Sequence, residues 1–232
     1  MQILKKATLI LTTALIANVS WSAQSDIDAI EDAYLGGQPA ALVNLIDSTQ
    51  GYDRFLAKYR LGMMYSFSQQ SDQAKATFAS LISGLEEHLV ANPNDSEALV
   101  LLAYTCGYSI TLDPAKATSY GQKSYQALAK AETLAPNNPR VYLVKGILQY
   151  NTPAAYGGSK DIAKQALEQA LALYPNDVNS GYYWGHDEAN IWLGLTLLEL
   201  GDKTSALTHF QAAATLEPNN GWAKYLLSSN TQ

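Results

Sequence analysis

One short motif determines which architectures are open to this chain. Pro-Asn followed by Asp or Asn occurs four times, starting at Pro93, Pro136, Pro175 and Pro218, at intervals of 43, 39 and 43 residues. Proline lacks the N–H that the next helical bond would need, and it moves the preceding residue out of the α region. The Asn or Asp that follows can cap a new helix. A helix, a turn and another helix at a near-constant period predict an all-α solenoid.

The residues before three of these prolines follow a common pattern. A large apolar residue lies eight positions before the proline and alanine lies five positions before it. The pairs are Leu128 and Ala131, Leu167 and Ala170, and Phe210 and Ala213. This spacing places both residues near one face of the helix that the proline ends.

The last repeat carries a family resemblance. Its residues occupy positions 7, 8, 11, 15, 20, 24, 27 and 32 of a 34-residue unit, and they are Leu193, Gly194, Leu197, Gly201, Ala206, Phe210, Ala213 and Pro218. This pattern resembles the tetratricopeptide repeat, except that Asn190 stands where Trp is usual. The resemblance implies antiparallel helix pairs stacked into a right-handed superhelix. Gly194 and Ala206 are expected to mark a close crossing of the paired helices.

The same frame extends backwards over most of the chain. We expect about five helix pairs and a C-terminal capping helix in a single domain over residues 23–232. The expected segments are Ile27–Leu35 and Pro39–Ile46 as a degenerate first pair, elongated second helices over Ser71–Ala91 and Pro114–Leu134, an inserted loop over Asn151–Gly158, and a cap starting at Trp222.

The first 22 residues are typical of a secretory signal peptide. Lys5 and Lys6 precede a short apolar core, and small residues follow around Ser22. That core is too short for a permanent membrane anchor, and no cysteine follows it for lipidation. We therefore expect an exported protein, in the simplest case a periplasmic one.

Charge and cysteine content narrow the function. The whole chain has a formal net charge of −6, which becomes −8 once Lys5 and Lys6 are removed, and it contains no cluster of basic residues. This balance argues against nucleic acid and anionic membranes as partners. Cys106 is the only cysteine, so an intramolecular disulfide is impossible, and it falls in an apolar stretch where burial is expected.

The sequence offers no convincing catalytic or metal-binding set. The three histidines are His88, His186 and His209, and His186 with Asp187 and Glu188 forms the one dense polar cluster. Adjacent helical residues point in different directions, so we expect these acids to complement the helix dipole rather than to bind metal. Glycines at 157 and 158 lack the lysine and spacing of a phosphate loop. We predict no enzyme activity and no cofactor.

Tyrosine is the most informative side chain, because 15 tyrosines stand against four phenylalanines. In a tetratricopeptide frame, positions 2, 5, 9, 12 and 13 of each first helix line the concave groove. Some tyrosines, such as Tyr65 and Tyr125, are expected to replace phenylalanine in the core. The predicted groove residues are Tyr59, Met63, Phe67, Tyr104, Tyr108, Arg140, Tyr150, Glu188 and Leu195, with Tyr156 of the inserted loop near the edge.

Two functions fit these features. The first is a non-catalytic module that binds a protein or peptide in the cell envelope through its aromatic groove. The second is a binder of a small apolar ligand that serves a transporter, because the long helices and the loop resemble those of exported repeat proteins such as the T-component associated with TRAP transporters. An open groove favours the first, whereas a closed pocket near Tyr104 and Tyr150 favours the second. The oligomeric state stays open.

Overall fold

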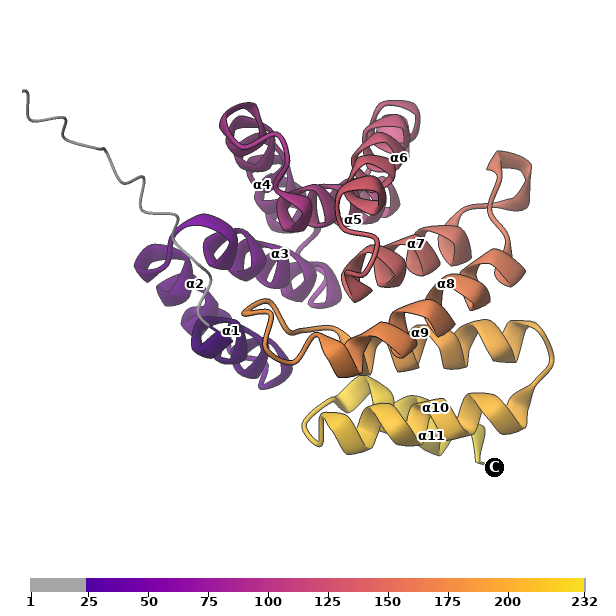
Figure 1. Cartoon of the computed structure of the whole chain (residues 1–232). Coiled ribbons are helices and arrows are strands. Elements are labelled where there is room, and N and C mark those ends of the chain that lie inside the picture. The colour runs from indigo at the N-terminus through magenta and orange to yellow at the C-terminus, as the bar shows by residue number, and fades with distance from the viewer. Residues whose placement is uncertain (1–23, 232) are drawn as a thin grey trace, which may run out of the picture.

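The computed structural model describes residues 24–231, and within that range it consists of helices and connecting turns without a strand (Figure 1). The predicted signal peptide lies outside the described residues. The helices are α1 (Gln24–Leu35), α2 (Pro39–Ser48), α3 (Gly51–Phe67), α4 (Ser71–Ala91), α5 (Ser96–Leu112), η1 (Pro114–Lys116), α6 (Ala117–Leu134), α7 (Pro139–Asn151), η2 (Ala154–Tyr156), α8 (Lys160–Leu173), η3 (Tyr174–Asn176), α9 (His186–Glu199), α10 (Lys203–Leu216) and α11 (Gly221–Asn230). Neighbouring helices pack as antiparallel pairs, so the predicted all-α solenoid is confirmed.

Three of the four Pro-Asn motifs cap a helix as expected. The side chains of Asp95, Asn138 and Asn220 accept hydrogen bonds from backbone N–H groups in the first turns of α5, α7 and α11. The third motif behaves differently. Asp177 pairs with Arg140, and an irregular segment of residues 177–185 separates it from α9. The expectation of a cap at Asp177 is therefore wrong, because its carboxylate neutralises a buried arginine instead.

Glycines in the first helices let the second helices pack closely. A Cβ at Gly62 would lie 2.6 Å from the ring of Phe78, which is too close for real atoms. A Cβ at Gly146 would overlap Leu167 in the same way, and one at Gly194 would overlap Phe210. The close crossing predicted at Gly194 is therefore present, and the atoms nearest to the glycine are those of the Phe210 ring.

The insertions fall where the pattern indicated. α4 spans the predicted Ser71–Ala91, while η1 and α6 together cover Pro114–Leu134. These two long second helices diverge as they leave α3 and α5 (Figure 1). Gly157 ends η2 in the left-handed region with φ of 90°, and Ser159 then caps α8. The inserted loop therefore turns back on itself beside the end of α7.

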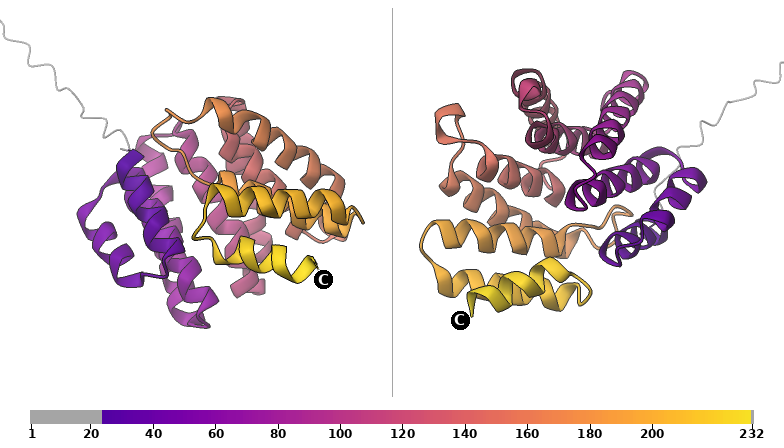
Figure 2. Two further views of the ribbon diagram at one scale, coloured as in Figure 1. Left: turned by 90° about the horizontal axis from the view of Figure 1, so that it is seen from below. Right: turned by 180° about the vertical axis from the view of Figure 1, so that it is seen from behind.

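A contact between distant parts of the chain closes the solenoid on one side. The side-chain amide of Gln24 in α1 donates to the carbonyl of Tyr183 at 2.9 Å and its oxygen accepts from the N–H of the same residue at 2.8 Å. The indole of Trp184 donates to the hydroxyl of Tyr52 in α3 at 2.9 Å. Figures 1 and 2 show the loop before α9 reaching the N-terminal helices from each direction of view. The first two helix pairs are thus joined directly to the segment that leads into the fifth.

The interior follows the apolar face of each helix. Cys106 is free and buried, as expected, and burial raises the pKa of its thiol to about 12. Within residues 24–231, no helix is both long and apolar enough to cross a bilayer.

Candidate functional site

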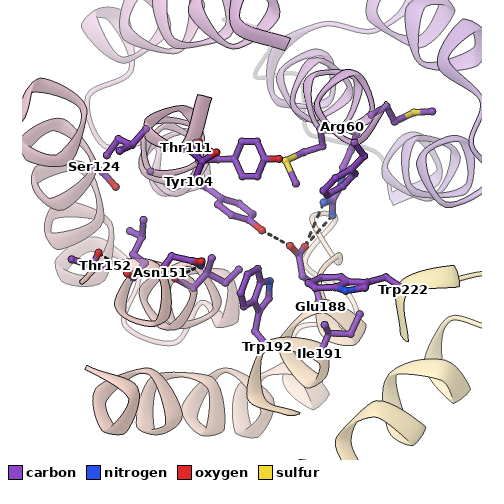
Figure 3. Close-up of a pocket in the computed structure, with 18 of the residues that line it drawn as sticks. Arg60, Tyr104, Thr111, Ser124, Asn151, Thr152, Glu188, Ile191, Trp192 and Trp222 are labelled. Carbon is purple, nitrogen blue, oxygen red and sulfur yellow. Dashed lines mark hydrogen bonds and ion pairs between the residues drawn. The ribbon is translucent and has the colours of Figure 1, made fainter. Parts of the chain in front are cut away.

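A cavity of about 1390 Å³ lies on the inner side of the curved helix array (Figure 3). Its walls come from the C-terminal halves of α3, α5 and α7, from the N-terminal parts of α6, α9 and α11, and from the end of α1. The closing contact between α1, α3 and the loop before α9 is what brings these elements around one space.

Most of the wall is apolar and aromatic. Methionine and aromatic side chains cover its α3 and α5 sides, and two indoles cover its α9 and α11 sides. Trp192 and Trp222 pack edge to face with ring centroids 5.5 Å apart. The remaining ring-bearing wall residues are Tyr34, Phe67, Tyr104, Tyr108, Tyr125 and Tyr156.

Charged residues of three helices meet at the cavity. The guanidinium of Arg60 in α3 donates to Glu31 of α1 at 2.8 Å and to Glu188 of α9 at 3.4 Å. The hydroxyl of Tyr104 in α5 donates to the other oxygen of Glu188. The Arg60 side chain is only 3% exposed, and its guanidinium lies over the ring of Tyr34 at 4.7 Å. We call these four interacting groups, Glu31, Arg60, Tyr104 and Glu188, the latch.

Burial changes the titration of the latch. It raises the pKa of Glu31 to about 7, although the positive charge of Arg60 opposes that rise. Burial, and then the Glu188 carboxylate, raise the pKa of Tyr104 well above its usual value. Tyr104 therefore stays a neutral hydrogen-bond donor at physiological pH, whereas Glu31 exchanges its proton near neutrality.

The rim of the cavity is more open. Phe67 is 63% exposed at the end of α3, and Tyr156 is 80% exposed in the inserted loop. Tyr108 lies deeper, and its hydroxyl shares a hydrogen bond of 2.8 Å with that of Ser66. The entrance thus presents aromatic rings to solvent.

Six of the residues predicted for the groove line this cavity. They are Met63, Phe67, Tyr104, Tyr108, Tyr156 and Glu188. Tyr125, which was expected in the core, also lines it and is 42% exposed, because α6 diverges from α4 and leaves that face open. Whether any of these side chains binds a partner stays a prediction.

The other predicted groove residues lie elsewhere. Tyr59 is completely buried, with its ring 4.7 Å from that of Tyr104, so its expected place on the groove was wrong. The predicted place of Arg140 on the groove was also wrong. Its side chain is 1% exposed, and it donates hydrogen bonds to Glu97 at 2.8 Å and to Asp177. Tyr150 stands behind the wall against Trp192, and Leu195 packs on the core. Tyr59 and Arg140 occupy positions 5 and 2 of their repeats. The close curvature of the solenoid buries these two positions in the protein interior.

Among the wall residues that sequence reasoning missed are Glu31, Arg60, Trp192 and Trp222. Glu31 joins the site only through the closing contact, for which no local pattern exists. The unusual position of Trp192, two residues after the expected tryptophan of the repeat, was the available signal. The position of Arg60, directly after the predicted groove residue Tyr59, was a second one.

The three histidines lie apart from one another, and each contacts a different neighbouring side chain. His88 hydrogen-bonds Asp95 at 2.7 Å, and His209 hydrogen-bonds Asn190 at 2.9 Å. His186 stacks on Tyr174 with ring centroids 4.7 Å apart, and burial lowers its pKa. Residues 24–231 contain no group of three or more His, Cys, Asp and Glu side chains placed to hold a metal ion.

Comparison with known proteins agrees with the repeat frame. Models of the tetratricopeptide repeat match residues 56–83 and 187–220. This chain is a tetratricopeptide-repeat protein. Repeats of this family form protein–protein interaction modules and are generally non-catalytic. No curated protein matches the chain.

Two solved structures share the fold of this tetratricopeptide-repeat protein. One is TTC0263, a thermophilic TPR protein of Thermus thermophilus, with 20% identity, a TM-score of 0.58, and coverage of 90% of this chain and 98% of that one. The other is the HusA haemophore of Porphyromonas gingivalis, with 22% identity, a TM-score of 0.59, and coverage of 76% and 91%. At these identities the likeness concerns the fold alone.

Proposed function

We propose that this chain is an exported, non-catalytic binding protein of the bacterial cell envelope that encloses an apolar ligand in its inner cavity. The observation that carries the proposal is the closure of the solenoid. Contacts of Gln24 and Arg60 with residues 183–188 close one side of the groove and leave a cavity inside the solenoid.

The size and lining of the cavity support enclosure of a ligand. Ligand pockets typically measure about 300–1,000 Å³ and are lined mainly by apolar and aromatic side chains with few polar groups. The cavity of about 1390 Å³ is somewhat larger, and the charged side chains of its wall lie in the latch or, for Asp187, next to it. A large apolar molecule fits this description better than a metabolite with many charges.

Likeness to other exported or ligand-binding repeat proteins supports the same proposal. HusA is called a haemophore, so a chain of this fold can serve a small molecule. The resemblance to the TRAP-associated T-component favours a ligand that is passed to a transporter. Export itself rests on the signal-peptide pattern of the first 22 residues.

A second candidate is binding of a protein or peptide segment, and the exposed rim favours it. Phe67 and Tyr156 are aromatic side chains of the kind that anchor partners, and both are more than half exposed. A peptide would place an apolar side chain in the cavity and the rest of its length along this rim.

A cavity-filling variant tests enclosure directly. Gly121 of α6 lines the cavity, and a Cβ there meets open space. Gly121→Phe should therefore fill the cavity without disturbing the fold. Ala129→Phe, on the exposed side of the same helix, is the matched control.

The measurement is calorimetric binding of a neutral apolar probe, N-phenyl-1-naphthylamine, to the mature chain. We expect the wild type and Ala129→Phe to bind equally, and Gly121→Phe to bind at least about tenfold more weakly because it occupies the space. Absence of binding by the wild type, or equal binding by all three proteins, would contradict the enclosure of an apolar ligand. Capture of one defined peptide by the wild type, lost in Tyr156→Ala, would favour the second candidate.

A further inference from the structure

The charges of the cavity wall are unequal. Glu31, Asp187 and Glu188 are acidic wall residues, and Arg60 is the only basic one among the described residues that line the cavity. When all four are ionised, the wall carries two more negative charges than positive ones. In a low-dielectric cavity such an excess acts strongly on the charge of a ligand.

Arg60 is not placed to offset this excess for an anionic ligand. Its side chain is 3% exposed, and its nitrogens donate to Glu31 and Glu188. Its guanidinium also lies against the ring of Trp184 at 5.2 Å, on the side of the closing loop. An anion that entered the cavity would meet carboxylates, with the one guanidinium already held between them.

The aromatic wall next to the Glu188 carboxylate also favours a cationic ligand over an anionic one. Figure 3 shows the Glu188 side chain next to the indole rings of Trp192 and Trp222. Ring faces attract cations through their quadrupole, tryptophan most strongly, and groups of aromatic rings are used to recognise quaternary ammonium ions. Asp187 lies beside this corner, where Asn220 of the α11 cap donates to it at 2.7 Å. Carboxylates and indoles thus converge from α9 and α11.

We propose that the cavity takes an organic cation, an amine or quaternary ammonium group on an apolar body. The cationic group lies by Glu188 against the packed indoles of Trp192 and Trp222, and the apolar body lies along Met63, Met64 and Tyr108 of the α3 and α5 walls. This inference rests on the proposed function, since it names the class of ligand for the same cavity.

Three probes of equal chain length separate the two proposals. Decyltrimethylammonium, decanol and decanoate, each below its aggregation concentration, are titrated into the mature wild-type chain by calorimetry. We expect the cation to bind at least about tenfold more tightly than the alcohol, and the carboxylate to bind most weakly.

Equal affinity for cation and alcohol, or preference for decanoate, would overturn the cation proposal while leaving the enclosing cavity in place. Failure of all three probes to bind would remove both proposals, because the cavity itself would then be without a ligand.

Two variants test which side chains cause the preference for a cation over an alcohol. Glu188→Gln removes one negative charge while its amide oxygen can still accept from Tyr104, and Trp222→Leu removes one ring from a side chain that is already 40% exposed. Glu87→Gln, exposed on α4 and outside the cavity, carries the same charge change as a control.

We expect the cation-to-alcohol affinity ratio to fall at least about fivefold in Glu188→Gln and Trp222→Leu, and to stay unchanged in Glu87→Gln. An unchanged ratio in Trp222→Leu would overturn the assignment, even where Glu188→Gln does not fold.

Discussion

Arg60 and Glu188 are 128 positions apart in the chain, and their side chains form an ion pair at 3.4 Å on the wall of the cavity. The pair connects the second helix pair to the fifth. Glu31 completes it from the first pair, so one guanidinium holds three parts of the solenoid at the same point. The wall of the cavity and the closure of the fold therefore depend on the same atoms.

Replacement of Arg60 by leucine should destabilise the protein strongly. It would leave the carboxylates of Glu31 and Glu188 facing each other without a counterion, and breaking a buried pair from one side typically costs about 3–5 kcal/mol. The measurement is the free energy of unfolding in urea. Arg54→Leu, exposed on the same helix, should change it by no more than about 0.5 kcal/mol. Similar values for both variants would show that the latch contributes little.

Replacement of Gly194 by leucine should also reduce stability, for a steric reason. Any Cβ at Gly194 overlaps the Phe210 ring, so the helices of the last pair would have to separate. Overpacking of this kind costs about 1–3 kcal/mol or more. Gly121→Leu is the matched control, because the same change in open space removes a helical glycine and should stabilise by up to about 1 kcal/mol. Equal midpoints of thermal unfolding in the two variants would contradict a close helix crossing at Gly194.

The pH dependence of stability should reveal the raised pKa of Glu31. An unfolded Glu31 ionises near its ordinary pKa of 4.5, whereas burial raises its pKa to about 7 in the folded protein. Between these values the folded state binds more protons than the unfolded state, so the contribution of Glu31 to stability decreases as the pH rises from about 4.5 to about 7. Wild type minus Glu31→Gln, measured by urea unfolding across this range, should show that decrease.

The control residue must lie outside the charged groups that face Glu31. They are Arg60 from α3 and Asp187 and Glu188 from α9. Glu87→Gln lies outside this set and should give a difference from wild type that stays flat over the same pH range. A flat difference for Glu31→Gln as well would mean that its carboxyl titrates as in the unfolded chain.

Export is tested by the mature N-terminus. Expression of the full chain in a Gram-negative host should release a protein that starts near Ala23 and that osmotic shock recovers from the periplasm. Mass spectrometry of the purified protein measures the cleavage site. Replacement of Leu11 by arginine should interrupt the apolar core and leave an uncleaved chain in the cytoplasm, and equal processing of both forms would contradict the assignment.

Local signals in the sequence were enough to predict the repeat and most element boundaries. Proline, Asn caps and helical glycines act within a few residues, so Ser71–Ala91 and the insertion before Ser159 could be placed from the sequence alone. The repeat frame predicted the close crossing at Gly194, but it did not show that the Phe210 ring would lie nearest to the glycine.

The site was only partly predictable because it depends on curvature. A standard repeat frame places Tyr59 and Arg140 on the groove, yet the tight closure buries both. Tyr104 shows the same effect, since it lines the cavity and is nonetheless 2% exposed. Its change to alanine should therefore cost about 3–5 kcal/mol rather than the modest loss expected for a surface groove. Glu31 could not be found from its own neighbours, because its partner Arg60 lies 29 positions farther along the chain.

The pairing of Gln24 with Tyr183 also bears on how the chain folds. In an open solenoid each repeat contacts only its neighbours, so folding can spread from any point and the ends can fray independently. Here a contact over 159 residues ties the first helix to the segment before the fifth pair, and closing so long a loop costs less entropy once the helices between have been ordered. The N-terminal helices should thus be the last to reach native protection in hydrogen exchange, and the folded protein should unfold as one cooperative unit rather than repeat by repeat.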